Sequence, residues 1–110
     1  MNEREKILVD NLVEYAVFAD QAYQKKKYNT AVTLYFKKIC AAIDLYLLRK
    51  SNLVPSSHTD RFRILQEKFP EIYELLDKDF PFYQESYNKR MNREAAKVLK
   101  DDATRITEMG

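Results

Sequence analysis

The chain has 110 residues and a net charge of +2, with 19 lysines and arginines against 17 acidic residues. This length fits a single domain with one modest core, and so small a net charge does not by itself imply a nucleic-acid partner. One glycine and three prolines leave little turn chemistry for an all-β fold. Since the abundant residues are helix formers, the composition favours an all-α protein.

The first predicted helix covers residues 3–26. Its apolar residues recur at steps of three and four, which gives one core-facing stripe: Leu8, Leu12, Tyr15, Ala16, Ala19, Ala22 and Tyr23. Lysines 25–27 close this helix, and we interpret them as cations that favour the negative end of the helix dipole. Asn29 or Thr30 is then expected to cap the second helix.

The second predicted helix, residues 29–49, is apolar on nearly every side between Ala31 and Leu48. Such a helix must be surrounded by other helices or by lipid. Charges near its middle argue against lipid, so we expect the central helix of a bundle and no membrane contact. Thr33, Lys37 and Asp44 recur at helical spacing, and this narrow polar stripe should meet solvent, a ligand or a second subunit.

The cellular compartment of the protein can be predicted from its cysteine content and its N-terminal residues. Cys40 is the only cysteine, so it cannot form an internal disulfide, and its apolar surroundings indicate a small buried side chain. The charged N-terminal residues are followed by no apolar segment typical of an export signal. Both observations favour a reducing, cytoplasmic setting.

The second half of the chain is divided by prolines. A loop at 53–57 precedes a helix at 59–68, for which Ser57 is the expected cap, with Asp60 completing a capping box. Pro70 and Pro81 are expected to separate a short helix, 71–78, from a helical segment, 82–91. Asn92 should cap a last helix, 93–109. This order predicts one domain, residues 1–110, folded as an up-and-down bundle of four to five helices.

His58, the only histidine, lies in the turn before the third helix. A lone histidine without cysteine neighbours is poor evidence for a metal, so no metal site or cofactor is expected. Two alternatives remain for His58: an exposed helix-start residue, or a polar contact at the mouth of the bundle.

A second group of candidates lies between residues 85 and 100. On a helix, Tyr87 and Arg90 would share a face, where Tyr87 could stack on a base and Arg90 could pair with phosphate. Alternatively Tyr87 packs in the core and Arg90 forms an ordinary salt bridge. A ridge that could follow a phosphate backbone comprises Lys89, Arg93, Lys97 and Lys100, or only the last three if Asn92 is a true cap. The alternative is a solvated face balanced by nearby acids.

These motifs together resemble the HEPN superfamily of small helical domains associated with nucleotide and RNA biology. The resemblance covers most of the chain, through the Tyr28-Asn-Thr-Ala-Val segment, the apolar helix ending in Asp44-Leu-Tyr-Leu-Leu48, the Pro55-Ser-Ser-His58-Thr-Asp60-Arg-Phe turn, Tyr87, and the Glu94-Ala-Ala start of the last helix. It implies a four- or five-helix bundle, usually a homodimer, often in a prokaryotic toxin–antitoxin pair with a minimal nucleotidyltransferase.

Many members of that superfamily are metal-independent ribonucleases with an Arg-x(4–6)-His motif, commonly followed by Tyr. Here Tyr87 matches the tyrosine, but Glu85 and Ser86 stand where the histidine would be, and no arginine precedes them at the required spacing. A solvated glutamate is a weak base at neutral pH. We therefore expect a non-catalytic binding module for RNA, a nucleotide or a partner protein, with Tyr87, Lys89, Arg90, Arg93 and Lys97 as binding residues. The alternative is a diverged ribonuclease using Glu85 or His58 with Arg90.

A homodimer is also expected from the aromatic content. Tyr15, Tyr35, Phe36 and Tyr46 look too numerous for so small a core, and large apolar patches left on a surface usually mark association sites.

Overall fold

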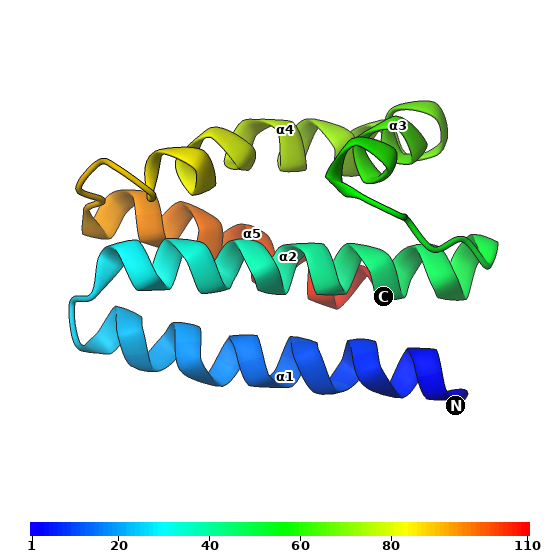
Figure 1. The fold of residues 1–110 in the computed structure, drawn as a ribbon, viewed down its shortest axis with the longest axis horizontal. Coiled ribbons are helices and arrows are strands. Elements are labelled where there is room, and N and C mark those ends of the chain that lie inside the picture. Colours follow the sequence, from blue (N-terminus) through cyan, green and yellow to red (C-terminus); the bar gives the residue numbers. More distant parts are fainter.

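The computed structural model describes residues 1–110 and contains five helices and no strands. They are α1 (Glu3–Gln24), α2 (Tyr28–Ser51), α3 (His58–Lys68), α4 (Pro70–Glu85) and α5 (Arg93–Met109). Helix α2 runs through the middle of the bundle, with α1 along one side and the α3–α4 layer along the opposite side (Figure 1). The predicted all-α bundle is confirmed.

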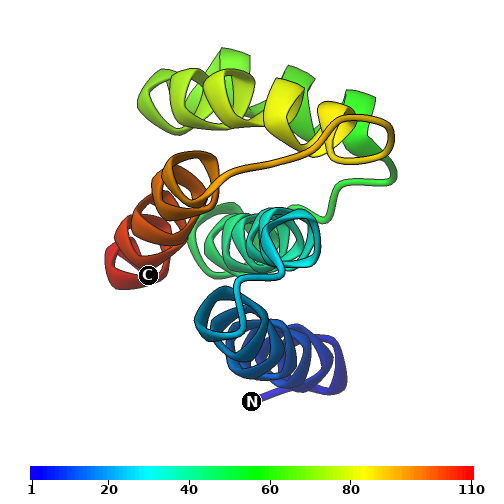
Figure 2. The same ribbon diagram turned by 90° about the vertical axis from the view of Figure 1, so that its left-hand side faces the viewer.

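Helix α2 is the centre of the core, as its composition predicts. It supplies nine of the twenty core residues, among them the fully buried Tyr35, Ile39 and Ile43. Figure 2, viewed along the bundle, shows α1, α5 and the α3–α4 layer arranged around α2. Because the aromatic residues Tyr35 and Phe36 are buried inside a single chain, their number does not by itself require a second subunit.

Two predicted helix caps are confirmed and one is wrong. The side chain of Asn92 accepts a hydrogen bond from the Ala95 amide at 2.9 Å, and Ser57 accepts one from the Asp60 amide at 3.1 Å. By contrast, α2 begins at Tyr28 without a side-chain cap. Asn29 lies in the first turn of α2, and its side chain donates a hydrogen bond to the carbonyl of Ser86 instead of capping the helix.

The predicted break at Pro81 is also wrong, because α4 continues through it to Glu85. A proline inside a helix removes one backbone hydrogen bond and crowds the preceding turn. Here Pro81 faces solvent, while Phe80 and Phe82 on either side of it pack against the core. We infer that this packing offsets the lost bond. The helix predicted for 82–91 instead ends at Glu85, and residues 86–92 form a connection to α5.

An unusual carboxyl pair is buried where α4 meets α5. Asp79 is fully buried and Asp102 is nearly so, yet neither carboxyl oxygen of Asp79 has a hydrogen-bond partner. The Lys78 ammonium lies 3.0 Å from Asp102 Oδ2 and 3.8 Å from Asp79 Oδ1. Burial, together with the neighbouring Asp102, raises the pKa of Asp79 to about 8. Asp79 is therefore mostly protonated at neutral pH.

None of the five helices combines the length and the apolar character needed to cross a bilayer.

Candidate nucleic-acid interface

Two connections meet at one end of the bundle. The α1–α2 turn and the α4–α5 connection lie at the same end because α1 and α2 are antiparallel, as are α4 and α5 (Figures 1 and 2). Residues 25–27, residues 86–92 and the first residue of α5 contain six cations and no acid: Lys25, Lys26, Lys27, Lys89, Arg90 and Arg93. We call these six exposed residues the basic end.

Lys26 of the basic end adopts a left-handed backbone conformation, with φ of 62°. Its amide donates to the Tyr23 carbonyl and the Lys27 amide donates to the Ala22 carbonyl, so the turn closes helix α1 tightly. Glycine is the favoured residue at such a position, since a side chain there costs about 1 kcal/mol. A lysine at this point is therefore not explained by the stability of the turn.

Asn29 holds the α4–α5 connection in place. Its Nδ2 donates to the carbonyls of Ser86 and Lys89 at 2.9 and 2.7 Å, and its Oδ1 accepts from the Met91 amide at 2.9 Å. Thr33, one turn further along α2, lies 3.2 Å from the Ser86 hydroxyl. The connection, which carries Lys89 and Arg90 of the basic end, is thus fixed to α2 by side-chain hydrogen bonds.

Tyr87 projects from this connection with 75 % of its surface exposed. Its hydroxyl lies 3.0 Å from that of Tyr83, and the two rings meet edge to face with centroids 5.6 Å apart. Since residues 86–92 are not helical, Tyr87 and Arg90 do not share a helix face, and that part of the prediction is wrong. The alternative that Tyr87 packs in the core is wrong as well. Tyr87 is an aromatic surface open to a stacking partner.

The predicted cation ridge begins at Arg93, because Asn92 is a true cap and Lys89 lies outside the helix. Arg93 and Lys100 both lie over the ring of Tyr23, at 5.6 and 5.2 Å from its centroid. Lys97 pairs with Asp101 at 2.7 Å. Arg93 and Lys100 thus tie α5 to α1 by cation–π contacts. Lys97 is partly neutralised, so it contributes less to a phosphate-binding surface than the prediction supposes.

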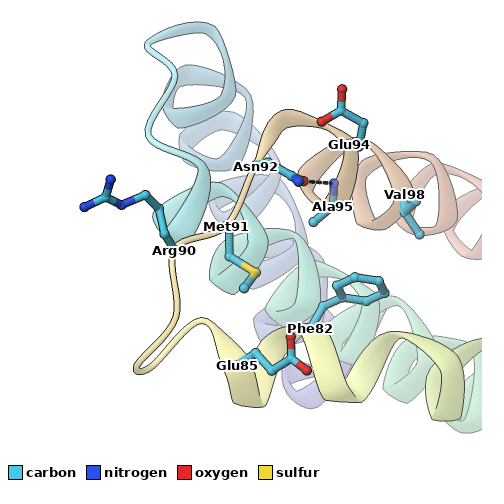
Figure 3. A pocket seen from close by; sticks show the side chains of 8 residues that line it. All are labelled: Phe82, Glu85, Arg90, Met91, Asn92, Glu94, Ala95 and Val98. Carbon is cyan, nitrogen blue, oxygen red and sulfur yellow. Dashed lines mark hydrogen bonds between the residues drawn. The ribbon is translucent and has the colours of Figure 1, made fainter.

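A pocket of about 390 Å³ opens beside the basic end, between the end of α4 and the start of α5 (Figure 3). Half of its eight lining residues are half-buried apolar side chains: Phe82, Met91, Ala95 and Val98. Glu85, Glu94 and Arg90 supply its charges, and Asn92 completes the lining. Arg90 extends outward from the rim, whereas Glu85 lies one helical turn from Phe82 (Figure 3). The nearest cation to Glu85 is Lys89, at a loose 3.9 Å.

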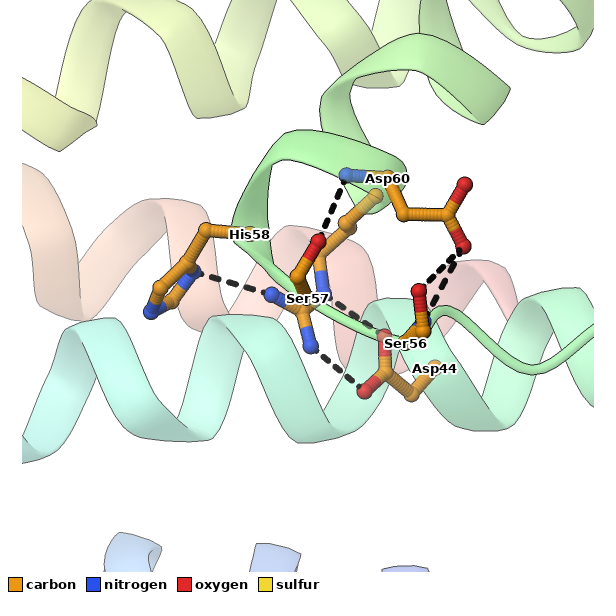
Figure 4. Close-up of polar contacts among 6 residues, drawn as sticks. Asp44, Ser56, Ser57, His58 and Asp60 are labelled. Atoms are coloured by element: carbon orange, nitrogen blue, oxygen red, sulfur yellow. Dashed lines mark hydrogen bonds and ion pairs between the residues drawn. The ribbon is translucent and has the colours of Figure 1, made fainter.

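His58 lies in a different groove, of about 190 Å³, whose lining comes from α1, α2, α3 and α4. Arg61 donates two hydrogen bonds to Asp44, at 2.7 and 2.8 Å, and a third to His58 Nδ1 at 2.9 Å (Figure 4). Burial and the Arg61 charge lower the pKa of His58, which favours the neutral ring. His58 also packs near the rings of Phe36 and Phe80. It therefore supports the join between α3 and the core.

The structure brings Glu85 and Arg90 to one pocket and separates His58, which lines the other groove, from both of them. No three His, Cys, Asp or Glu side chains converge as a metal site requires.

Three features of these sites are missed by sequence reasoning. The lysine triplet is interpreted above as a helix-end signal, although three consecutive cations can also mark a binding patch. Asn29 is interpreted as a cap, and nothing near it in the sequence indicates its true partners. The pairing of Asp44 with Arg61 is missed too, although an acid in an apolar helix calls for a buried cation.

Comparison of the chain with protein-family models, with curated proteins and with solved structures finds no match.

Proposed function

We propose that this protein is a non-catalytic module that binds single-stranded RNA through the basic end. The observation that carries the proposal is that six exposed cations, from segments some sixty residues apart in the sequence, lie at the end of the bundle that also carries the exposed ring of Tyr87 (Figure 1). Cations neutralise phosphates, and an aromatic ring stacks on an unpaired base. A folded duplex would not present such a base, so a single strand is the better fit.

The proposal does not include RNA cleavage, because the pocket that holds Glu85 and Arg90 contains no histidine to act as a second acid–base group. General acid–base catalysis requires the two groups within reach of the same reacting atoms. Glu85 lies on the pocket of the basic end without a histidine beside it, and His58 accepts a hydrogen bond from Arg61 in the other groove. Arg90 therefore has no histidine partner.

Salt-dependent binding tests the proposal directly. A fluorescein-labelled RNA strand should bind with an affinity that falls as salt rises, and each phosphate contact removed should reduce the slope by about 0.7. Arg90→Ala should weaken binding, whereas Arg63→Ala, an exposed arginine of α3, is the matched control. Binding that is insensitive to salt and to Arg90→Ala would refute the proposal.

Lys26→Gly separates binding from stability. Glycine relieves the left-handed backbone at this position, so the variant should melt at a higher temperature, yet it should bind RNA more weakly because one cation is lost. Incubation of the same labelled strand without metal should leave it intact. If the wild-type protein cleaves the strand and Glu85→Ala does not, the binding proposal is refuted in favour of the ribonuclease alternative.

A further inference from the structure

The pocket beside the basic end differs in charge from its surroundings. Its lining carries the carboxylates of Glu85 and Glu94 and one arginine, while Arg90 at its rim and Lys89, 3.9 Å from Glu85, belong to the basic end. A phosphate is therefore attracted to the rim and disfavoured inside. The part of a nucleotide that enters should be uncharged, flat and apolar on its faces, and rich in hydrogen-bond donors on its edge.

We propose that this pocket binds a guanine base of the RNA strand, with Glu85 as the group that reads it. The inference rests on the proposed function and names the base that the site selects. A carboxylate has two acceptor oxygens, and it pairs best with two donors placed side by side. Guanine offers N1–H and N2–H next to each other on its Watson–Crick edge. Adenine, cytosine and uracil have no such adjacent pair of donors.

The geometry around Glu85 suits this role. Phe82 lies one turn before Glu85 on α4, and Met91 lines the same pocket, so apolar surface is available to the faces of the base (Figure 3). The Glu85 side chain is 44 % exposed, and its only cation, Lys89 at 3.9 Å, leaves its oxygens available to a ligand. Arg90 extends from the rim, where the phosphate of the same nucleotide would lie (Figure 3). The volume of about 390 Å³ is within the range of about 300–1,000 Å³ found for small-molecule sites.

Three labelled strands test the selectivity: an oligouridylate, the same strand with one central guanine, and the same strand with one central adenine. We expect the guanine strand to bind at least about tenfold more tightly than the other two. Glu85→Gln should remove this preference while the strands still bind, because the cations remain. Glu74→Gln, an exposed glutamate near the other end of α4, should keep it. Equal affinity for all three strands, or a preference that survives Glu85→Gln, would overturn the proposal.

Guanosine 5′-monophosphate tests the guanine site separately, because a free nucleotide can occupy the pocket without any binding of an RNA strand. Its addition should shift the methyl NMR signal of Met91, adenosine 5′-monophosphate should not, and Glu85→Gln should abolish the shift. If strands bind in a salt-dependent manner but show no base preference, and the Met91 signal does not shift, the guanine site is refuted and the RNA-binding proposal is retained. If guanosine 5′-monophosphate shifts the signal selectively but no strand binds, the RNA-binding proposal is refuted and the guanine site is retained.

Discussion

Replacing Asp79 by asparagine should stabilise the protein at neutral and mildly alkaline pH. In the native chain the Asp79 carboxyl is fully buried beside Asp102, and no hydrogen bond compensates an ionised form. Asparagine has nearly the same shape and no charge, and its amide could donate to Asp102. The exchange therefore removes a titration and keeps the packing between α4 and α5.

The size of the effect follows from the pKa of Asp79, which is raised from 3.8 to about 8. A group whose pKa is raised by folding contributes to the free energy of unfolding, and this contribution is complete at pH values below the pKa of the group in the unfolded chain. The contribution is lost as the pH rises to the pKa of the group in the folded protein. Between pH 3.8 and about 8, each pH unit removes up to about 1.4 kcal/mol. Asp79→Asn should thus gain a few kcal/mol at pH 8 relative to pH 4, which is roughly 10 °C or more in melting temperature for a domain of this size.

Urea unfolding of wild type and Asp79→Asn across this pH range is the assay. The difference between the two free energies of unfolding should grow with pH and level off near pH 8, because above that pH Asp79 is ionised in both the folded and the unfolded chain. Groups that do not face Asp79 titrate alike in the two proteins and cancel. Asp77→Asn, an exposed carboxylate on the same helix, should show no such growth. A difference between wild type and Asp79→Asn that does not change with pH would refute the argument that Asp79 is buried in its protonated form.

Three further predictions concern the loop, the buried ion pair and association. Asn29→Ala should speed hydrogen exchange of the Met91 amide at least about tenfold, because the bond that holds this amide is lost; unchanged exchange would show that the connection holds itself. Arg61→Ala should cost about 3 kcal/mol by leaving Asp44 half-buried without its cation, and Asp44→Leu in the same chain should restore much of that loss in urea unfolding. If Asp44→Leu does not restore stability, the loss in Arg61→Ala comes from lost packing and not from the unpaired Asp44 charge. Sedimentation should give a dimer that Phe18→Ser weakens, since α1 leaves this ring 53 % exposed among other apolar residues; a wild-type monomer of 13.1 kDa would refute the dimer prediction.

Local signals account for the parts of the fold that could be predicted. The burial of α2 follows from its own composition, since a helix apolar on most sides has no stable place on a surface. The caps at Ser57 and Asn92 join residues three apart, so the sequence determines them directly. The same local logic fails at Pro81, where core packing of the neighbouring aromatic residues outweighs the backbone preference of one residue.

The candidate site depends on contacts that local patterns do not encode. Asn29 and the Met91 amide are 62 residues apart, and only the antiparallel packing of α4 and α5 on α2 brings them together. The same packing places lysines 25–27 at the same end of the bundle as Lys89, Arg90 and Arg93. The sequence by itself determined the positions of α1, α2, α3 and α5 and the central place of α2, because apolar patterns act within a few turns of one helix. It did not determine the course of α4, which packing carries through Pro81. The tertiary structure alone decided where the charges gather and what the polar side chains bind, because those depend on which helix ends meet.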